Sequence, residues 1–240
     1  MVFGYVYEAG LRRNNQDALL VRSTKLSQGE LVMAVVCDGM GGEEYGEQAS
    51  YECVQYLDCW FDRELLPVFM NDHYTFYEKR KIIRTKGNSA FYQINQKLFH
   101  MMRKHMGRMG TTVSMLILYG NNYYLFHLGD SRVYFVHSVL GKTYFKQKTT
   151  DHAVGHRLRR CLGLNKDYRP DFDYGIITCK NFVLCTDGFS NLFDSNIWSM
   201  CLATKSMTDS GRISRRLKEL AEDNLRKGET DNISALWMKV

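Results

Sequence analysis

Residues 35–50 read VVCDGMGGEEYGEQAS, in which an apolar run ends at one carboxylate, Asp38, and three glycines follow within four residues. Asp-Gly is a common hairpin signal, but a hairpin needs a second strand directly after its turn. Here a helical pattern follows from Glu47. Asp38 therefore does not belong to a simple hairpin, and it serves either as a turn residue or as a metal ligand.

Three other aspartates also stand at the ends of apolar runs. Asp187 follows NFVLCT, Asp130 follows YYLFHLG, and Asp231 precedes NISALWMK. Carboxylates brought together at one poorly solvated rim would repel one another by about 4 kcal/mol per pair at roughly 4 Å and an effective dielectric constant of about 20. Cations are therefore expected between them.

The residues around these acids suit hard divalent cations and phosphate. Mg²⁺ and Mn²⁺ prefer oxygen ligands, and no cluster of His and Cys indicates zinc. Gly39 would let its carbonyl approach a metal ion without a side chain in the way. Arg12 and Arg13 lie just ahead of Asp17, and either guanidinium could bind an anion such as phosphate.

The order of apolar patterns predicts an α+β fold with two packed, mainly antiparallel β-sheets and helices outside them. Two long helices, at 47–69 and 89–105, should lie together, and three successive strands between 111 and 138 should form a β-meander with tight turns. Without an obvious linker, residues 1–240 are expected to form a single domain. The other expected elements are strands at 2–8, 18–23, 31–37, 181–186 and 231–240 and helices from 195 and at 210–226.

Composition narrows the class of protein. The 240 residues are 45% hydrophobic, which is ample for a packed core, and no apolar run approaches the roughly 20 residues that span a bilayer. A cytoplasmic protein that does not enter a membrane is expected, since the N-terminus lacks the pattern of a signal peptide. The seven cysteines include no CxxC pair, so neither disulfides nor a structural zinc site are expected.

Residues 79–108 contain nine Lys or Arg and no Asp or Glu, within a net charge of +6. Such a segment is either a surface that attracts nucleic acid or phosphopeptides, or the solvated face of a helix. Ile83, Phe91, Ile94 and Leu98 recur at near-helical spacing, which favours the solvated helix face. Nucleic acid is therefore not an expected partner.

Eight motifs, in order along nearly the whole chain, resemble the metal-dependent protein phosphatases of type 2C (the PPM family), and bacterial serine/threonine phosphatases in particular. This resemblance implies the four-layer α/β/β/α sandwich of those enzymes, with residues 1–240 as one catalytic domain. The motifs are RRNNQD (12–17), VVCDGMGG (35–42), MGTTVSMLIL (109–118), HLGDSRVYFV (127–136), TTDH (149–152), RRCLG (159–163), FVLCTDGF (182–189) and GETDNIS (228–234).

The resemblance implies a role for each matching residue at a centre with two Mn²⁺ or Mg²⁺ ions and room for a third. Asp38 would bridge the two ions, and Arg12 would hold the phosphate of the substrate. Asp17 would act in the outer shell, and Asn232 would support the site from beside Asp231. The remaining ligands implied are the Gly39 carbonyl for the second ion, Asp187 and Asp231 for the first, and Asp130 with Asp187 for a weaker third.

The activity implied is hydrolysis of phosphoserine and phosphothreonine in proteins by water that the two ions activate. Such an enzyme would be a monomer that reverses a bacterial serine/threonine kinase in signalling. The alternative is a catalytically weak or inactive relative that serves as a binding or regulatory module. Retention of Arg12, Asp38, Gly39, Asp187 and Asp231 favours an active enzyme.

Three positions depart from the family pattern. Met40 stands where many relatives have His, so no imidazole is available there as a general acid. Gln16 replaces a frequent Glu, and the flap segment between TTDH and RRCLG is short. Near that segment, His152 and His156 are expected to be structural or solvent-exposed. The hydroxyls of Thr111, Thr112 and Ser131 are expected to shape turns and strand starts.

Overall fold

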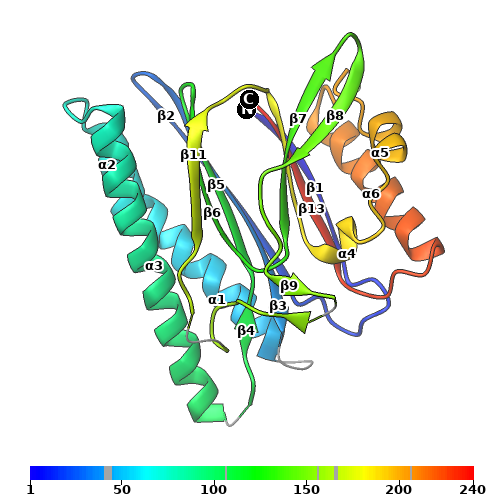
Figure 1. The fold of residues 1–240 in the computed structure, drawn as a ribbon, viewed down its shortest axis with the longest axis horizontal. Helices are drawn as coiled ribbons and strands as arrows, with labels where there is room; N and C mark the ends of the chain where they lie inside the picture. Colours follow the sequence, from blue (N-terminus) through cyan, green and yellow to red (C-terminus); the bar gives the residue numbers. More distant parts are fainter. Residues whose placement is uncertain (41–44, 106, 156, 165–166, 206) are drawn as a thin grey trace.

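Two antiparallel β-sheets pack face to face, and helices cover both outer faces (Figure 1). The computed structural model describes residues 1–240 except 41–44, 106, 156, 165, 166 and 206. The strands are β1 (Val2–Glu8), β2 (Asp17–Leu26), β3 (Gly29–Met40), β4 (Gly110–Thr111), β5 (Val113–Tyr119), β6 (Asn122–Leu128), β7 (Arg132–Val139), β8 (Lys142–Gln147), β9 (Ala153–Val154), β10 (Arg157–Leu158), β11 (Asp171–Ile176), β12 (Asn181–Cys185) and β13 (Ile233–Lys239). The helices are α1 (Tyr45–Trp60), the π-helical segment η1 (Phe61–Leu65), α2 (Leu66–Met70), α3 (Phe76–His105), α4 (Asp187–Ser190), α5 (Ser195–Cys201) and α6 (Ser210–Arg226).

The strand order confirms the predicted pair of sheets. One sheet has the order β11-β6-β5-β3-β2 and lies under α1, α2 and α3. The other has the order β1-β13-β12-β7-β8 and lies under α5 and α6. The α/β/β/α layering expected from the sequence is therefore correct.

Strand β3 shows why its sequence is apolar without interruption. The side chains of Met33 and Val35 pack into the core beneath the helices, whereas Ala34 and Val36 pack between the two sheets. Because successive side chains of a strand point to opposite faces, both sets must be apolar. Both cores therefore hold β3 in place, and the strand positions Asp38 rigidly near its end.

Helix α3 begins thirteen residues earlier than predicted, at Phe76 and not at Ser89. The start is a capping box: the Thr75 hydroxyl accepts the Glu78 N–H at 3.3 Å, and the Glu78 carboxylate accepts the Thr75 N–H at 2.8 Å. The prediction placed the start too late because it followed only the apolar spacing. The helical interpretation of the basic segment is confirmed, with Phe91 and Leu98 buried on the inner side.

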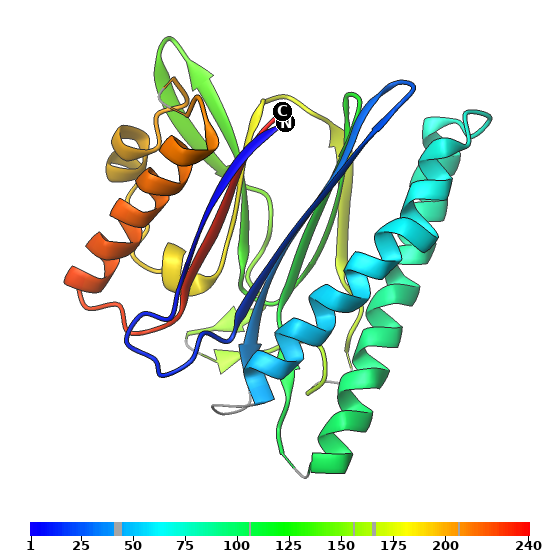
Figure 2. The same ribbon diagram turned by 180° about the vertical axis from the view of Figure 1, so that it is seen from behind.

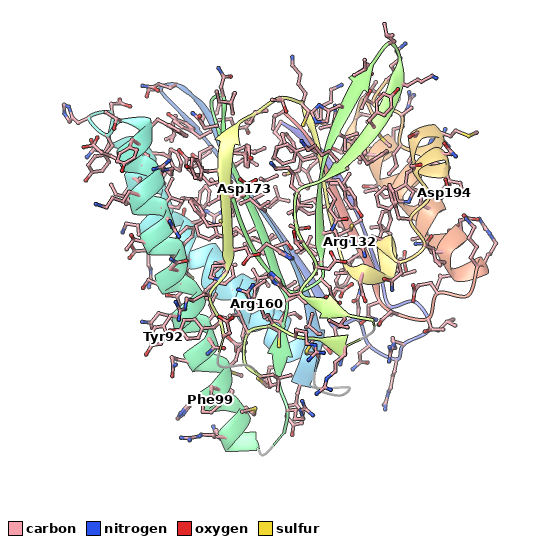
Figure 3. All side chains as sticks on the ribbon, viewed as in Figure 1. Tyr92, Phe99, Arg132, Arg160, Asp173 and Asp194 are labelled. Atoms are coloured by element: carbon pink, nitrogen blue, oxygen red, sulfur yellow. The ribbon has the colours of Figure 1, made fainter. Side chains whose placement is uncertain are left out.

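The predicted β-meander is wrong at its third strand. Strands β5 and β6 form an antiparallel hairpin, but β7 belongs to the other sheet, between β12 and β8. The turn between β6 and β7 crosses from one sheet to the other at Gly129, which has a φ of +123°. Strand β11, which the sequence analysis missed, pairs with β6 at the sheet edge and carries Asp173, labelled in Figure 3.

The two ends of the chain lie side by side (Figures 1 and 2). Strand β1 pairs antiparallel with β13, so Val2 lies opposite Lys239. No helix among the described residues is long and apolar enough to cross a lipid bilayer. All seven cysteines are free thiols, as expected.

Candidate functional site

Five aspartates from five separate segments meet at one end of the sandwich. Asp17 begins β2 and lies directly opposite Asp38 in the β2–β3 pair. Asp130 lies in the turn between β6 and β7, Asp187 begins α4, and Asp231 comes just before β13. The start of β2, the end of β3 and the start of β13 lie at the same end of the molecule in Figure 2. The structure therefore brings the predicted acids together.

Burial and mutual repulsion raise the pKa values of four of these acids, Asp17, Asp38, Asp130 and Asp187. The pKa of Asp38 lies well above its usual range because of burial first, and then because of the negative charges of Asp17, Asp187, Asp130 and Asp231. Burial raises the pKa of Asp17 to about 7, and burial with repulsion from Asp187 raises that of Asp130 to about 7. The pKa of Asp187 is also raised, by burial and then by Asp231. Cations at this site would remove the repulsion.

The donor set fits hard divalent cations. The acids supply only oxygen, which Mg²⁺ and Mn²⁺ prefer. Asp17 Oδ2 accepts a hydrogen bond from the Thr186 hydroxyl at 3.0 Å, while the buried Oδ1 has no partner among the described residues and is available to a ligand. Within the described ranges, no three Asp, Glu, His or Cys side chains already stand together as ligands of one ion. The fit therefore rests on the chemistry and charge of the donors.

Threonines hold the backbone of Asp38 in place. The Asp38 N–H donates to Thr112 Oγ1 at 2.9 Å, and the Asp38 carbonyl accepts from the Thr112 N–H at 2.8 Å and the Thr111 hydroxyl at 3.0 Å. The Thr112 hydroxyl in turn lies 2.7 Å from that of Ser131. The sequence analysis assigned these hydroxyls to turns and strand starts. The motif MGTTVS contains both threonines but does not reveal this role, because Asp38 lies 74 positions away from Thr112.

Gly39 is required by a close approach of three backbone segments. A Cβ atom at this position would lie 2.0 Å from the Gly46 carbonyl oxygen and 2.6 Å from that of Gln16. The Gly39 N–H also donates to the Gln16 carbonyl at 3.1 Å. The glycine thus serves backbone packing, a reason that the sequence did not suggest, and the role of its own carbonyl as a ligand stays a prediction. Gly41 and Gly42 of the same motif lie outside the described residues.

Arg12 lies at the edge of the acidic cluster. Its Nε and Nη2 atoms are each 3.2 Å from an oxygen of Asp231, and 57% of its side chain is exposed. Asn232 holds the loop that carries Arg12: its Oδ1 accepts the Gln16 N–H, and its Nδ2 donates to the carbonyls of Ala9 and Asn14, all at 2.9 Å. Asn232 thus fixes the Arg12 loop beside Asp231, and its support of a metal site stays a prediction.

His152 has a structural place next to Asp130. Its ring Nδ1 accepts the backbone N–H of Gly129 at 3.0 Å, and its backbone N–H donates to the Gly129 carbonyl at 2.7 Å. Its ring Nε2 lies 2.9 Å from Asp171 Oδ2. Arg160 (Figure 3) also binds Asp171, at 2.9 Å. The ring stacks on that of His127, whose pKa burial and His152 lower to about 4. His152 therefore shapes the Asp130 turn, whereas His156 lies outside the described residues.

Two comparisons of the sequence with known proteins both match protein phosphatases. The profile of the family described as protein phosphatase 2C matches residues 10–222. The serine/threonine phosphatase stp of Listeria welshimeri is 24% identical, over 95% of this chain and 91% of its own length. The protein phosphatase PhpP of Streptococcus pneumoniae is 26% identical over 77% of each chain.

Solved structures share the fold. The serine/threonine phosphatase Stp1 from Staphylococcus aureus superposes with a TM-score of 0.77 at 21% identity, over all of this chain and 95% of that one. The catalytic domain of the phosphatase PstP, in complex with two manganese ions, superposes with a TM-score of 0.73 at 23% identity, over 99% and 96% of the two chains.

Proposed function

Since the chain belongs to the protein phosphatase 2C family, we propose that it hydrolyses phosphoserine and phosphothreonine in proteins with the help of divalent cations. The observation that carries this proposal is the meeting of five aspartates at one end of the sandwich, with an exposed arginine at their edge. Residues 1–240 would act as one catalytic domain. The names of the serine/threonine phosphatases that it resembles support the choice of substrate.

The cations proposed are two Mn²⁺ or Mg²⁺ ions, with a weaker third. Asp38, Asp187 and Asp231 would hold the two ions together with the Gly39 carbonyl, and Asp130 would serve the third. When bound, the two ions would activate a water molecule for attack on phosphorus. The structure of PstP with two manganese ions supports this number and kind of metal.

The other residues act around these ligands. Arg12 would leave Asp231 to bind the phosphate, for which its planar guanidinium is suited and its exposure leaves room. Asn232 would keep the Arg12 loop in place, and Asp17 would act from the outer shell of the metal site. The side chain of Met40 cannot donate a proton to the leaving oxygen, so that proton must come from another group.

We propose phosphorylated proteins, made by a serine/threonine kinase, as the substrates of a monomeric enzyme. The test is hydrolysis of a phosphothreonine peptide and of p-nitrophenyl phosphate, with Mn²⁺ and with EDTA. Turnover should depend on the metal and fall at least about a thousandfold in Asp38→Ala and Asp187→Ala, because each removes a ligand. Asp72→Ala, at an exposed position far along the sequence from the acids, should keep wild-type turnover.

Each result of this test bears on the proposal. Full turnover in EDTA, or in both aspartate variants, would overturn the metal-dependent reaction. A folded wild type that binds Mn²⁺ but hydrolyses neither compound would favour the alternative, a binding or regulatory module with a phosphatase fold.

A further inference from the structure

A second pocket lies at the opposite end of the sandwich from the aspartates. It has a volume of about 320 Å³, is open to solvent, and is lined by the start of α3, the end of α2 and the turns between β2 and β3 and between β5 and β6. We call it the Lys79 pocket. Its main walls are Phe69, Tyr74, Phe76, Lys79, Tyr119 and Tyr124.

Strand β5 links the pocket to the aspartate site and sets the distance between them. Thr112, directly before β5, binds the backbone of Asp38, whereas Tyr119 ends the strand in the Lys79 pocket. Seven residue steps at about 3.3 Å each separate the two ends by roughly 23 Å. A ligand in the Lys79 pocket would therefore not touch a substrate at the aspartates.

The Lys79 side chain is largely buried against two aromatic rings. The residue is only 7% exposed, and its Nζ lies 5.7 Å from the ring centres of both Phe69 and Tyr119. Among the described residues, Nζ has no carboxylate or hydrogen-bond partner. Cation–π contacts of this kind compensate for only part of the hydration free energy that an ammonium group loses when it is shielded from water. The pocket thus presents a positive charge that an anion would stabilise.

Most of the other walls are aromatic, and Tyr119, Gln28, Asn121 and Asn122 add polar groups. The hydroxyl of Tyr119 is buried and has no hydrogen-bond partner within the described part of the chain. The Tyr119 ring packs on Phe69 at 4.7 Å between centroids, and Phe76 lies 6.1 Å from Tyr124. Tyr74 and Phe76 are 38% and 40% exposed. These walls suit a flat ring that enters from solvent.

The capping box of α3 holds the pocket in shape. The reciprocal hydrogen bonds between Thr75 and Glu78 fix the first turn of the helix. Phe76 and Lys79 are three positions apart in this turn, so their side chains lie on the same face. Both residues therefore take their places in the pocket before a ligand binds.

We propose that the Lys79 pocket binds a small aromatic compound with a single carboxylate. The carboxylate pairs with Lys79 and accepts a hydrogen bond from Tyr119, while the ring lies among Phe69, Phe76 and Tyr124. The volume is at the low end of the range for ligand sites, which excludes nucleotides and other large polyanions. This site is separate from the proposed phosphatase reaction, and its existence does not depend on that activity.

The test is a titration of the whole protein with 4-fluorobenzoate, followed by the fluorine NMR signal of the ligand, without metal ions or substrate. Binding should weaken at least about tenfold in Lys79→Met, which keeps the unbranched stem between the two rings, and severalfold in Tyr119→Phe. Lys142→Met, at an exposed position of β8, is the matched control and should bind like wild type. Thermal unfolding checks that each variant is folded.

A neutral ligand of the same shape tests the charge without any mutation. 4-Fluorobenzyl alcohol should bind wild type at least about tenfold more weakly than 4-fluorobenzoate. The proposal is overturned if 4-fluorobenzoate does not bind at millimolar concentration, if the alcohol binds equally well, or if Lys79→Met retains full affinity. Because no turnover is measured, failure here is distinct from failure of the phosphatase proposal.

Discussion

Asp17 and Asp38 are unfavourable for the fold when no cation is present. Asp17 and Asp38 face one another across a strand pair, where like charges are destabilising. Thr186 offers Asp17 a hydroxyl hydrogen bond, but no basic side chain of the described residues pairs with Asp17 or Asp38 in the structure. The proposed function and stability are therefore in conflict at these positions.

Asp38→Asn should separate the two effects. In EDTA, the free energy of unfolding at pH 7 should rise by about 2 kcal/mol, because the amide removes a buried charge that its neighbours repel. Metal-dependent hydrolysis should disappear in the same variant. Urea unfolding and phosphopeptide turnover measure the two quantities, and Asp72→Asn should change neither. A less stable Asp38→Asn protein would show that the repulsion is not significant.

Arg12→Ala should affect the substrate and not the metal. We expect KM for a phosphothreonine peptide to rise at least about tenfold, since a bidentate contact with phosphate is lost. The dissociation constant for Mn²⁺, from calorimetry, should change less than about threefold. Arg215→Ala, at an exposed position on α6, serves as the control. Loss of Mn²⁺ affinity in Arg12→Ala would mean that the arginine mainly orients Asp231.

At the scale of elements, α3 lies very close to the sheet at Gly87. A Cβ atom there would lie 2.3 Å from two ring carbons of Phe126, which is itself buried between Phe91 and Phe172. Glycine in a helix usually costs about 1 kcal/mol relative to alanine. In α3 this intrinsic cost is offset by the contact that the missing side chain allows.

Gly87→Ala should therefore destabilise the protein, by about 2 kcal/mol, although alanine is the better helix former. Gly211→Ala in α6 is the matched control, because the nearest atom to its Cβ would be 3.5 Å away. This second substitution should stabilise by about 0.5 kcal/mol. Urea unfolding of both variants measures the contrast, and stabilisation by both would show that α3 can move away from β6.

Elements with strong local signals were predictable, and those set by tertiary contacts were not. The strand at 31–37 was clear because both of its faces must be apolar, and α6 was predicted with its observed bounds. The membership of β7 was not predictable, since the turn at Gly129 has the residues of a hairpin and only packing sends the chain to the other sheet. Strand β11 is short and half polar, and it forms by pairing with β6.

In the candidate site too, residues with a local sequence signal were predictable and residues placed by tertiary contacts were not. The aspartates at strand ends could be recognised because each adjoins an apolar run. Thr112 and Thr186 could not, because their hydroxyls act on a backbone amide and a carboxylate that lie 74 and 169 positions away. Their roles depend on the pairing of strands and not on any local pattern.

For the whole molecule, the balance of titrating groups predicts an unusual dependence of stability on pH. The raised pKa values of Asp17 and Asp130, about 7 each, mean that the folded protein binds more protons than the unfolded chain between about pH 4 and 7. Their contribution to stability is present below pH 4 and is lost as pH rises to 7. His127 acts in the opposite direction: its pKa of about 4 when folded removes stability as pH falls from about 6.5.

The two carboxyl groups with raised pKa values affect stability more than the one imidazole with a lowered pKa. The protein without metal should therefore be more stable at pH 5 than at pH 7. The expected difference in the free energy of unfolding is about 2 kcal/mol. Saturating Mn²⁺ should reverse the order, because cations favour the ionised carboxylates. Urea unfolding at the two pH values, in EDTA and in Mn²⁺, tests this. Greater stability at pH 7 in EDTA would contradict the raised pKa values.

The pairing of β1 with β13 determines how the molecule would respond to force. Because the two strands are antiparallel and both chain ends lie at the same end of the pair, tension applied at Met1 and Val240 would open the ladder one hydrogen bond at a time. The bonds would not bear the load together, as they do when strands are pulled past one another. In an optical trap the fold should therefore yield at low force when held by its ends, despite the large core behind those strands.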